Sequence, residues 1–239
     1  MELIRITGGR WAGVRSLFTP AGLTTGLTTG LTVGLVAAGL LATGCVVRID
    51  GSSEEMVAES FEIDAFTELK LGGAFEVELE VGPEPSLEVE LPESLVDDLE
   101  VDSSGGRLVV RVDRGWSSTE GPVVLRVTTP VVEIIDLEGA TRVDLVGLDG
   151  GSLDLALEGA SQVTASGSLD RLVIEASGAS RVKFDQVSVE EVEIEVDGSS
   201  SVELERAAKV TGSVSGASSV DVSDDATLDV STSGVASVD

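Results

Sequence analysis

A five-residue motif recurs six times in the C-terminal half of the chain, and it constrains the fold more than any other feature. Each copy has the form Gly-x-x-x-Val, with mostly Ala and Ser in the two positions after the glycine. The copies begin at Gly139, Gly159, Gly178, Gly198, Gly216 and Gly234. Successive glycines are separated by 20, 19, 20, 18 and 18 residues. So even a period indicates stacked structural units, each one contacting its neighbours.

The stretch before each glycine alternates between aliphatic and acidic residues. Leu153–Glu158 and Val192–Asp197 are examples. Alternation with a period of two places the aliphatic side chains on one face of a strand and the carboxylates on the other. A glycine after such a strand supplies the backbone angles of a corner, and the small residues behind it allow successive corners to lie close together.

This pattern predicts an all-β fold in which each repeat forms one coil of a β-solenoid. A coil of about 19 residues holds two short strands and two bends, and equivalent residues of neighbouring coils lie about 4.8 Å apart. Strands at this spacing are also compatible with an antiparallel β-sandwich. The fixed phase of the corner motif favours the β-solenoid.

A looser version of the pattern continues toward the N-terminus. Gly73 begins one further copy, Gly73-Ala74-Phe75-Glu76-Val77, and a short helical turn is expected over residues 92–99. Residues 60–239 are therefore interpreted as a single β-solenoid domain. Residues 45–59, which are rich in Ser, Glu and Gly after the first few positions, are interpreted as a flexible tether.

The first 44 residues have the layout of an export signal. Three arginines lie within the first fifteen residues, and an uncharged, increasingly apolar run follows up to Gly44. The sequence Leu41-Ala42-Thr43-Gly44-Cys45 resembles a bacterial lipobox, which implies cleavage before Cys45 and lipidation of its thiol. An uncleaved membrane helix is the alternative. With Val46 after the cysteine, the resemblance to Gram-negative lipoproteins implies a lipid anchor in the outer membrane, facing the periplasm or the cell surface.

Composition excludes several kinds of activity. The formal charge of −28 disfavours binding to nucleic acid. The chain contains no histidine and only one cysteine, which excludes Ser-His-Asp and Cys-His catalytic groups and histidine-containing zinc sites. Asp221, Asp224 and Asp225 are the densest acidic cluster in the repeats, but they lack the glycine-bearing pattern of a calcium loop. No catalytic residue, metal site or cofactor is predicted.

The combination of motifs resembles the bacterial family known as putative auto-transporter adhesin, head GIN domain. The resemblance rests on Gly73–Val77, Gly106–Val110 and the six later corners, and it spans about residues 60–239. It implies an extracellular or periplasmic binding domain with no agreed reaction. The chain departs from the family pattern in its acidity and in its last corner, Ser233-Gly234-Val235-Ala236.

These observations predict a non-enzymatic envelope or cell-surface lipoprotein that acts as an adhesin-like binding module for a protein or glycan. One alternative is a polysaccharide-acting enzyme that uses Asp and Glu pairs with Arg142 or Arg181. Another is an envelope scaffold with no ligand of its own.

Overall fold

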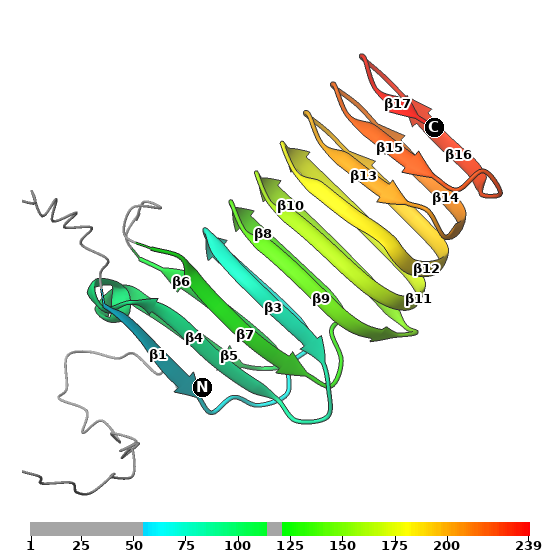
Figure 1. Cartoon of the computed structure of the whole chain (residues 1–239). Coiled ribbons are helices and arrows are strands. Elements are labelled where there is room, and N and C mark those ends of the chain that lie inside the picture. Colours follow the sequence, from blue (N-terminus) through cyan, green and yellow to red (C-terminus); the bar gives the residue numbers. More distant parts are fainter. Residues whose placement is uncertain (1–54, 114–120) are drawn as a thin grey trace, which may run out of the picture. The chain divides into compact units, whose positions relative to one another are not determined.

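The described residues form a β-solenoid, as the repeat predicts. A computed structural model describes residues 55–113 and 121–239 (Figure 1). Within these ranges the strands of successive repeats pair in parallel, which distinguishes the fold from the antiparallel sandwich. The predicted signal peptide, Cys45 and most of the predicted tether lie outside the described residues.

Two layers of strands lie back to back. The front layer, which faces the viewer in Figure 1, contains the following strands in spatial order: β1 (Met56–Phe61), β4 (Ser86–Pro92), β7 (Val123–Thr129), β3 (Phe75–Val81), β9 (Arg142–Asp149), the first halves of β11 (Gln162–Gly178) and β12 (Arg181–Val196), β13 (Ser201–Leu204), β15 (Ser219–Val222) and β17 (Ser237–Val238).

The back layer contains β5 (Leu99–Ser104), β6 (Arg107–Val112), β2 (Glu68–Gly73), β8 (Ile134–Gly139), β10 (Ser152–Gly159), the second halves of β11 and β12, β14 (Ala207–Val214) and β16 (Thr227–Thr232). β11 and β12 each pass from the front layer into the back layer.

The core lies between the two layers. The alternating residues that point inward are almost all Leu, Val and Ile, and they form one continuous hydrophobic cluster. Phe66, Phe75 and Phe184 are the largest fully buried side chains. Since burying one such side chain contributes about 1.5 to 3 kcal/mol, this cluster is the main source of stability for the stack.

The order of the coils in space differs from their order in the sequence. β2 pairs in parallel with β6 on one side and with β8 on the other. β3 likewise lies between β7 and β9. The coil that ends at Gly73 is therefore inserted between two coils that follow it in the chain, and it stacks directly on the coil that ends at Gly139.

Antiparallel strands close the N-terminal end of the stack. β4 pairs antiparallel with β7 and β1, and β5 pairs antiparallel with β6. The expected helical turn is present as a 3-10 helix, η1 (Glu93–Asp98), whose Leu95 is fully buried. β1 begins at Met56, so the last four residues of the segment predicted as a tether belong to a strand. No helix in the described part of the chain is long and apolar enough to cross a membrane.

Candidate contact surface

The seven corner glycines singled out in the sequence lie in one column along an edge of the stack. These are Gly73, Gly139, Gly159, Gly178, Gly198, Gly216 and Gly234. At each step the residue after one glycine donates its backbone N–H to the carbonyl oxygen of the glycine in the previous coil, with N to O distances of 2.7 to 2.9 Å. We call this the glycine column.

Close stacking explains why glycine is required in the column. The backbone φ of Gly178 is 88°, and residues that carry a Cβ seldom adopt an angle in this region. A Cβ atom at this position would lie 3.2 Å from both the carbonyl carbon and the nitrogen of Gly159, and still closer to its oxygen. The glycine column is therefore a packing feature of the fold and brings no reactive groups together.

A second column, of hydroxyl groups, lies just inside the corner. Its members stand two residues after the corner glycines and are at most 2% exposed: Thr141, Ser161, Ser180, Ser200 and Ser218. The Ser200 hydroxyl accepts a hydrogen bond from the Ser180 N–H at 3.3 Å and donates one to the Asp197 carbonyl at 3.2 Å. These hydroxyls satisfy buried backbone groups that the turn leaves without strand partners.

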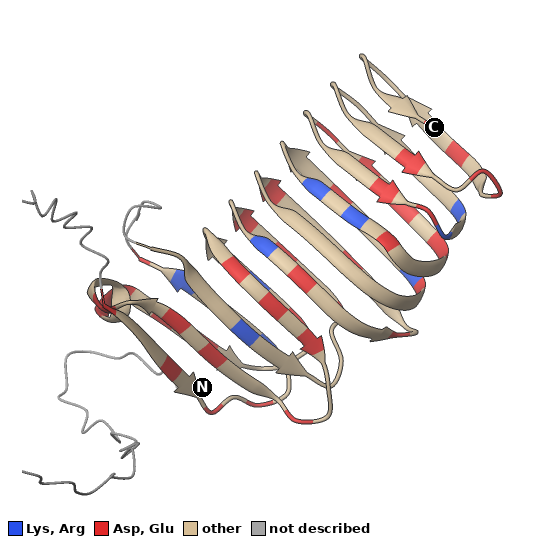
Figure 2. Cartoon of the chain, viewed as in Figure 1, with Lys and Arg blue, Asp and Glu red and all other residues tan. Residues whose placement is uncertain are grey.

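Charged residues lie along the strands of the stack, and acidic residues outnumber basic ones (Figure 2). Most of the described cations are paired with carboxylates. Arg126 on β7 lies 3.3 Å from Glu78, 3.0 Å from Glu88 and 3.3 Å from Glu90. Hydrogen bonds to Glu90 and Glu88 raise the pKa of the Arg126 guanidinium above its usual value. These ion pairs link the antiparallel strand β4 to the parallel strands β7 and β3.

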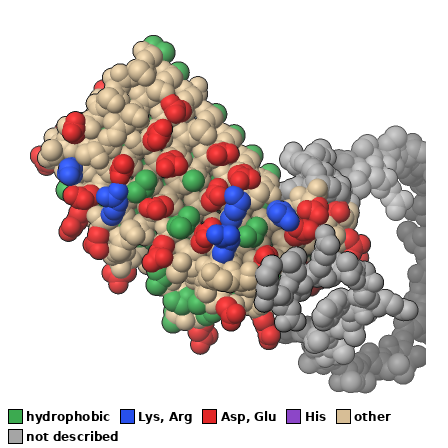
Figure 3. Space-filling model, turned by 180° about the vertical axis from the view of Figure 1, so that it is seen from behind, with side chains coloured by type: hydrophobic (Ala, Val, Ile, Leu, Met, Phe, Trp, Pro, Cys, Tyr) green, Lys and Arg blue, Asp and Glu red, His purple; other side chains and the backbone are tan. Residues whose placement is uncertain are grey.

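The back layer contains a similar group around Lys70. Its ammonium lies 2.7 Å from Asp136 and 2.8 Å from Glu138, which belong to the neighbouring strand β8. Hydrogen bonds to these two carboxylates raise the pKa of Lys70 well above its usual range. Seen from behind, basic side chains lie among acidic ones (Figure 3). Each of these ion pairs contributes little to stability, because its side chains are exposed to solvent.

Three arginines differ from this pattern. Seven of the ten described lysines and arginines have a carboxylate oxygen within 3.7 Å. Arg142, Arg181 and Arg206 have no such partner among the described residues. Arg142 and Arg181 share a row on the front layer, because each is the register partner of Gln162. Arg206 lies in the turn after β13.

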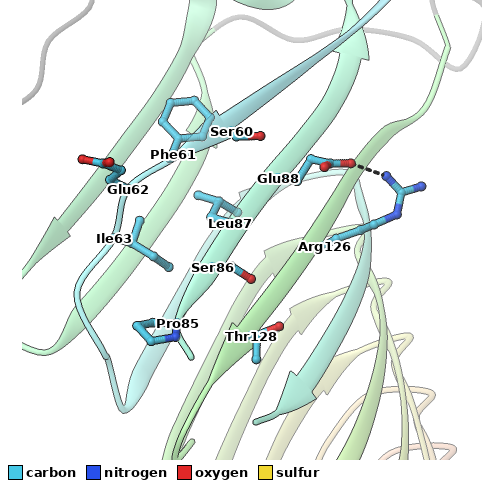
Figure 4. Close-up of a pocket in the computed structure, with 10 residues that line it drawn as sticks. All are labelled: Ser60, Phe61, Glu62, Ile63, Pro85, Ser86, Leu87, Glu88, Arg126 and Thr128. Carbon is cyan, nitrogen blue, oxygen red and sulfur yellow. Dashed lines mark hydrogen bonds and ion pairs between the residues drawn. The ribbon is translucent and has the colours of Figure 1, made fainter. Parts of the chain in front are cut away.

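Three shallow hollows lie on the surface of the described residues. The first, of about 440 Å³, lies where β1 ends beside β4, and Figure 4 shows its apolar side chains Phe61, Ile63 and Leu87 with the Glu88 to Arg126 ion pair at its rim. A second, of about 480 Å³, lies at the corner edge and is lined by Ala140, Ala160, Arg142 and Gln162 among others.

A third hollow, of about 360 Å³, lies at the opposite bend. Val81, Pro130 and Val131 contribute apolar surface to it, and Val131 is 50% exposed. All three hollows are open on one side. Open hollows of this kind are better suited to contact with an extended partner than to enclosure of a small molecule.

No candidate metal centre is found among the described residues. No group of three or more Asp, Glu or Cys side chains in residues 55–113 and 121–239 is arranged to hold a metal ion. Arg142 and Arg181, which the enzyme alternative invokes, are two coils apart. One buried atom, Oδ1 of Asp185, has no hydrogen-bond partner there. Asp185 lies where the register between β11 and β12 shifts. The sequence pattern does not reveal this shift.

Two solved structures of putative adhesins are similar to this chain. A putative adhesin from Bacteroides fragilis NCTC 9343 is 14% identical, with a TM-score of 0.65, over 78% of this chain and 97% of that one. A putative adhesin from Parabacteroides merdae ATCC 43184 is also 14% identical, over 79% of this chain and 96% of that one, with a TM-score of 0.47. At this identity the first likeness shows the fold alone. A search of curated proteins finds no match.

Family membership rests on the sequence itself. The profile of the family described as "Putative auto-transporter adhesin, head GIN domain" matches residues 65–239. This range contains the glycine column, the hydroxyl column and the strands β9 and β12, which carry Arg142 and Arg181. It also includes the inserted Gly73 coil, as the sequence resemblance implied. The chain therefore belongs to the family described as "Putative auto-transporter adhesin, head GIN domain".

Proposed function

We propose that the chain is an exported, non-enzymatic binding module that holds a surface or envelope partner along the outer faces of its coils. The observation that carries this proposal is the form of the surface. Outward side chains stand in straight rows with a fixed spacing of about 4.8 Å, on strands that are hydrogen-bonded on both sides through most of the stack. A rigid ladder of this kind is preorganised for an extended ligand, so little conformational entropy is lost on binding.

The distribution of ionisable groups also supports a binding role over catalysis. Most enzymes that hydrolyse glycans use two carboxyl groups that flank the scissile bond. Here neighbouring carboxylates such as Glu175 and Glu195 stand side by side in a ladder and point the same way. Their geometry provides a charged face.

Lipid anchoring through Cys45 is the second part of the proposal. Its support is the lipobox-like sequence ending at Gly44 and the family's link to adhesins. Metabolic labelling with a radioactive or clickable fatty acid in a bacterial host tests it directly. Label should appear in the wild-type chain, and Cys45→Ser should abolish the label. A wild-type chain that lies in the membrane fraction without any label would favour an uncleaved helix.

The binding role is tested with the purified full chain on an array of defined glycans and on intact bacterial and host cells. Saturable binding that leaves the ligand chemically unchanged is the expected result. Release of shorter glycan products, detected by mass spectrometry, would overturn the non-enzymatic assignment. Absence of saturable binding to every glycan and cell surface would overturn the binding role and favour a scaffold.

A further inference from the structure

We infer that the row containing Arg142, Gln162 and Arg181 binds an anionic glycan in which a uronic acid alternates with an N-acetylated amino sugar. This inference rests on the proposed binding function and assigns its site. We call these three residues the arginine row. It runs along the front layer beside the corner edge, where β9, β11 and β12 begin.

The first argument concerns charge. In a chain with a formal charge of −28, most described cations are held by at least one carboxylate. Arg142 and Arg181 are both exposed and have no carboxylate partner among the described residues, although Glu76 is the register partner of Arg142. Two guanidinium groups are thus free to receive carboxylates from outside, and guanidinium binds a carboxylate through two parallel hydrogen bonds.

The second argument concerns spacing. Arg142 and Arg181 are separated by one coil, that of Gln162, so their backbones lie about 10 Å apart. The Gln162 and Arg181 N–H groups each donate to the previous coil at 2.8 Å, which fixes this spacing. An extended polysaccharide repeats its disaccharide at a comparable distance. Side chains on one face of an extended peptide recur every 6.6 to 6.8 Å or so, which matches neither one coil nor two.

The third argument concerns the surface beside the row. The second hollow borders Arg142 and Gln162, and the exposed methyl groups of Ala74, Ala140 and Ala160 line it. An N-acetyl methyl can rest on such a surface while its amide hydrogen-bonds to a side-chain amide such as that of Gln162. The site therefore offers a strip of small apolar groups that runs beside the arginine row.

The surrounding acids add selectivity. Glu76 and Asp144 flank Arg142 in the same sheet, and they repel any anionic group that is not held by an arginine. A polymer with one carboxylate per disaccharide places its charges only at the arginines. A polymer that is charged at every sugar also places carboxylates against this acidic face, so it binds less tightly.

The test measures binding of the purified full chain to hyaluronate oligosaccharides, whose disaccharide unit is a glucuronate and an N-acetylglucosamine. The comparison ligands are the same oligosaccharides with reduced carboxyl groups, polygalacturonate and poly-glutamate. The variants are Arg142→Gln and Arg181→Gln. Arg206→Gln is the matched control, because it removes an equally unpaired, exposed arginine away from the row.

We expect each row variant to weaken hyaluronate binding by about tenfold, and Arg206→Gln to leave it unchanged. Carboxyl reduction should weaken binding at least as much. Equal affinity of row and control variants, undiminished binding of the reduced polymer, tighter binding of polygalacturonate or poly-glutamate, or no binding of hyaluronate would each overturn the inference. The proposed function fails separately, because only the absence of saturable binding to every glycan and every cell surface would overturn it.

Discussion

Three consecutive positions at each corner have three different physical roles. The glycine permits the close approach of the previous coil, the next residue projects a small side chain outward, and the third buries a hydroxyl that bonds the turn. In the last corner Ala236 stands where the other late corners have serine, so the Ser218 N–H receives no hydroxyl from that coil. One oxygen atom thus decides whether the N–H of the previous corner has a side-chain acceptor.

The glycine requirement at Gly178 predicts a stability loss that exceeds the cost of the backbone angle alone. Gly151 is a suitable control, because it has a φ of 77° but nothing within 4 Å of a Cβ placed on it. Gly151→Ala should cost about 1 to 2 kcal/mol from the left-handed conformation. Gly178→Ala should cost a further 1 to 3 kcal/mol or so, because the added methyl overlaps Gly159. Urea unfolding measures both, and equal losses would contradict the stacking argument.

The hydroxyl column predicts a different pair of effects. In Ser200→Ala the buried Ser180 N–H loses its acceptor, which should lower the free energy of unfolding by about 1 to 3 kcal/mol. Ser201→Ala removes the neighbouring hydroxyl, which has no such bond, and should change stability by less than about 0.5 kcal/mol. Thermal unfolding at matched pH compares the two. A neutral Ser200→Ala would mean that water replaces the hydroxyl.

At the scale of strands, the sequence predicts the parallel coils well because each repeat is under the same local constraint. Alternation fixes which face of Val192–Val196 is buried, and the corner glycine fixes where the strand ends. The insertion of the Gly73 coil between later coils has no local signal. It depends on which strand edges pair, and β2 and β3 show the same alternation whichever neighbours they have.

The candidate site was less predictable than the fold for a related reason. The sequence shows arginines three residues after the corner glycines, and it thus places Arg142 and Arg181 in one row. Which cations are neutralised depends on rotamers and on strands far away in sequence, as with Arg126 and its three glutamates from β3 and β4. The distinction between a paired and an unpaired arginine therefore emerges only in three dimensions.

Alternation along β12 predicts opposite effects for adjacent residues. Ile194 is 1% exposed and packs in the core, so Ile194→Ala should lower the free energy of unfolding by about 2 to 5 kcal/mol. Glu195 points outward next to Glu175, so Glu195→Ala should leave stability within about 0.5 kcal/mol or raise it slightly. Chemical denaturation of both variants tests the register. Comparable losses at the two positions would mean that the strand is shifted by one residue.

At the scale of the whole molecule, negative charge is distributed over both faces of the stack. Several carboxylates are register partners of other carboxylates, including Glu175 with Glu195, Glu203 with Asp221, and Glu78 with Asp144. Two charges about 4 Å apart in water repel by only about 1 kcal/mol, but the repulsion accumulates along the ladder. The ion pairs of the exposed lysines and arginines offset only part of it, since there are far fewer cations than acids.

Thermal stability should therefore rise with salt. Increasing sodium chloride from about 0.01 M to 1 M shortens the Debye length from about 30 Å to 3 Å, which screens the carboxylate rows. Each kcal/mol regained should raise Tm by about 2 to 4 °C for a domain of this size. A double variant, Glu175→Gln with Glu195→Gln, separates screening from general effects of salt on water, because it removes one repelling pair and leaves the core intact. Its Tm should be higher than that of the wild type at low salt and should depend less on salt. A flat or falling Tm in the wild type would mean that the ion pairs outweigh the repulsion between the carboxylate rows.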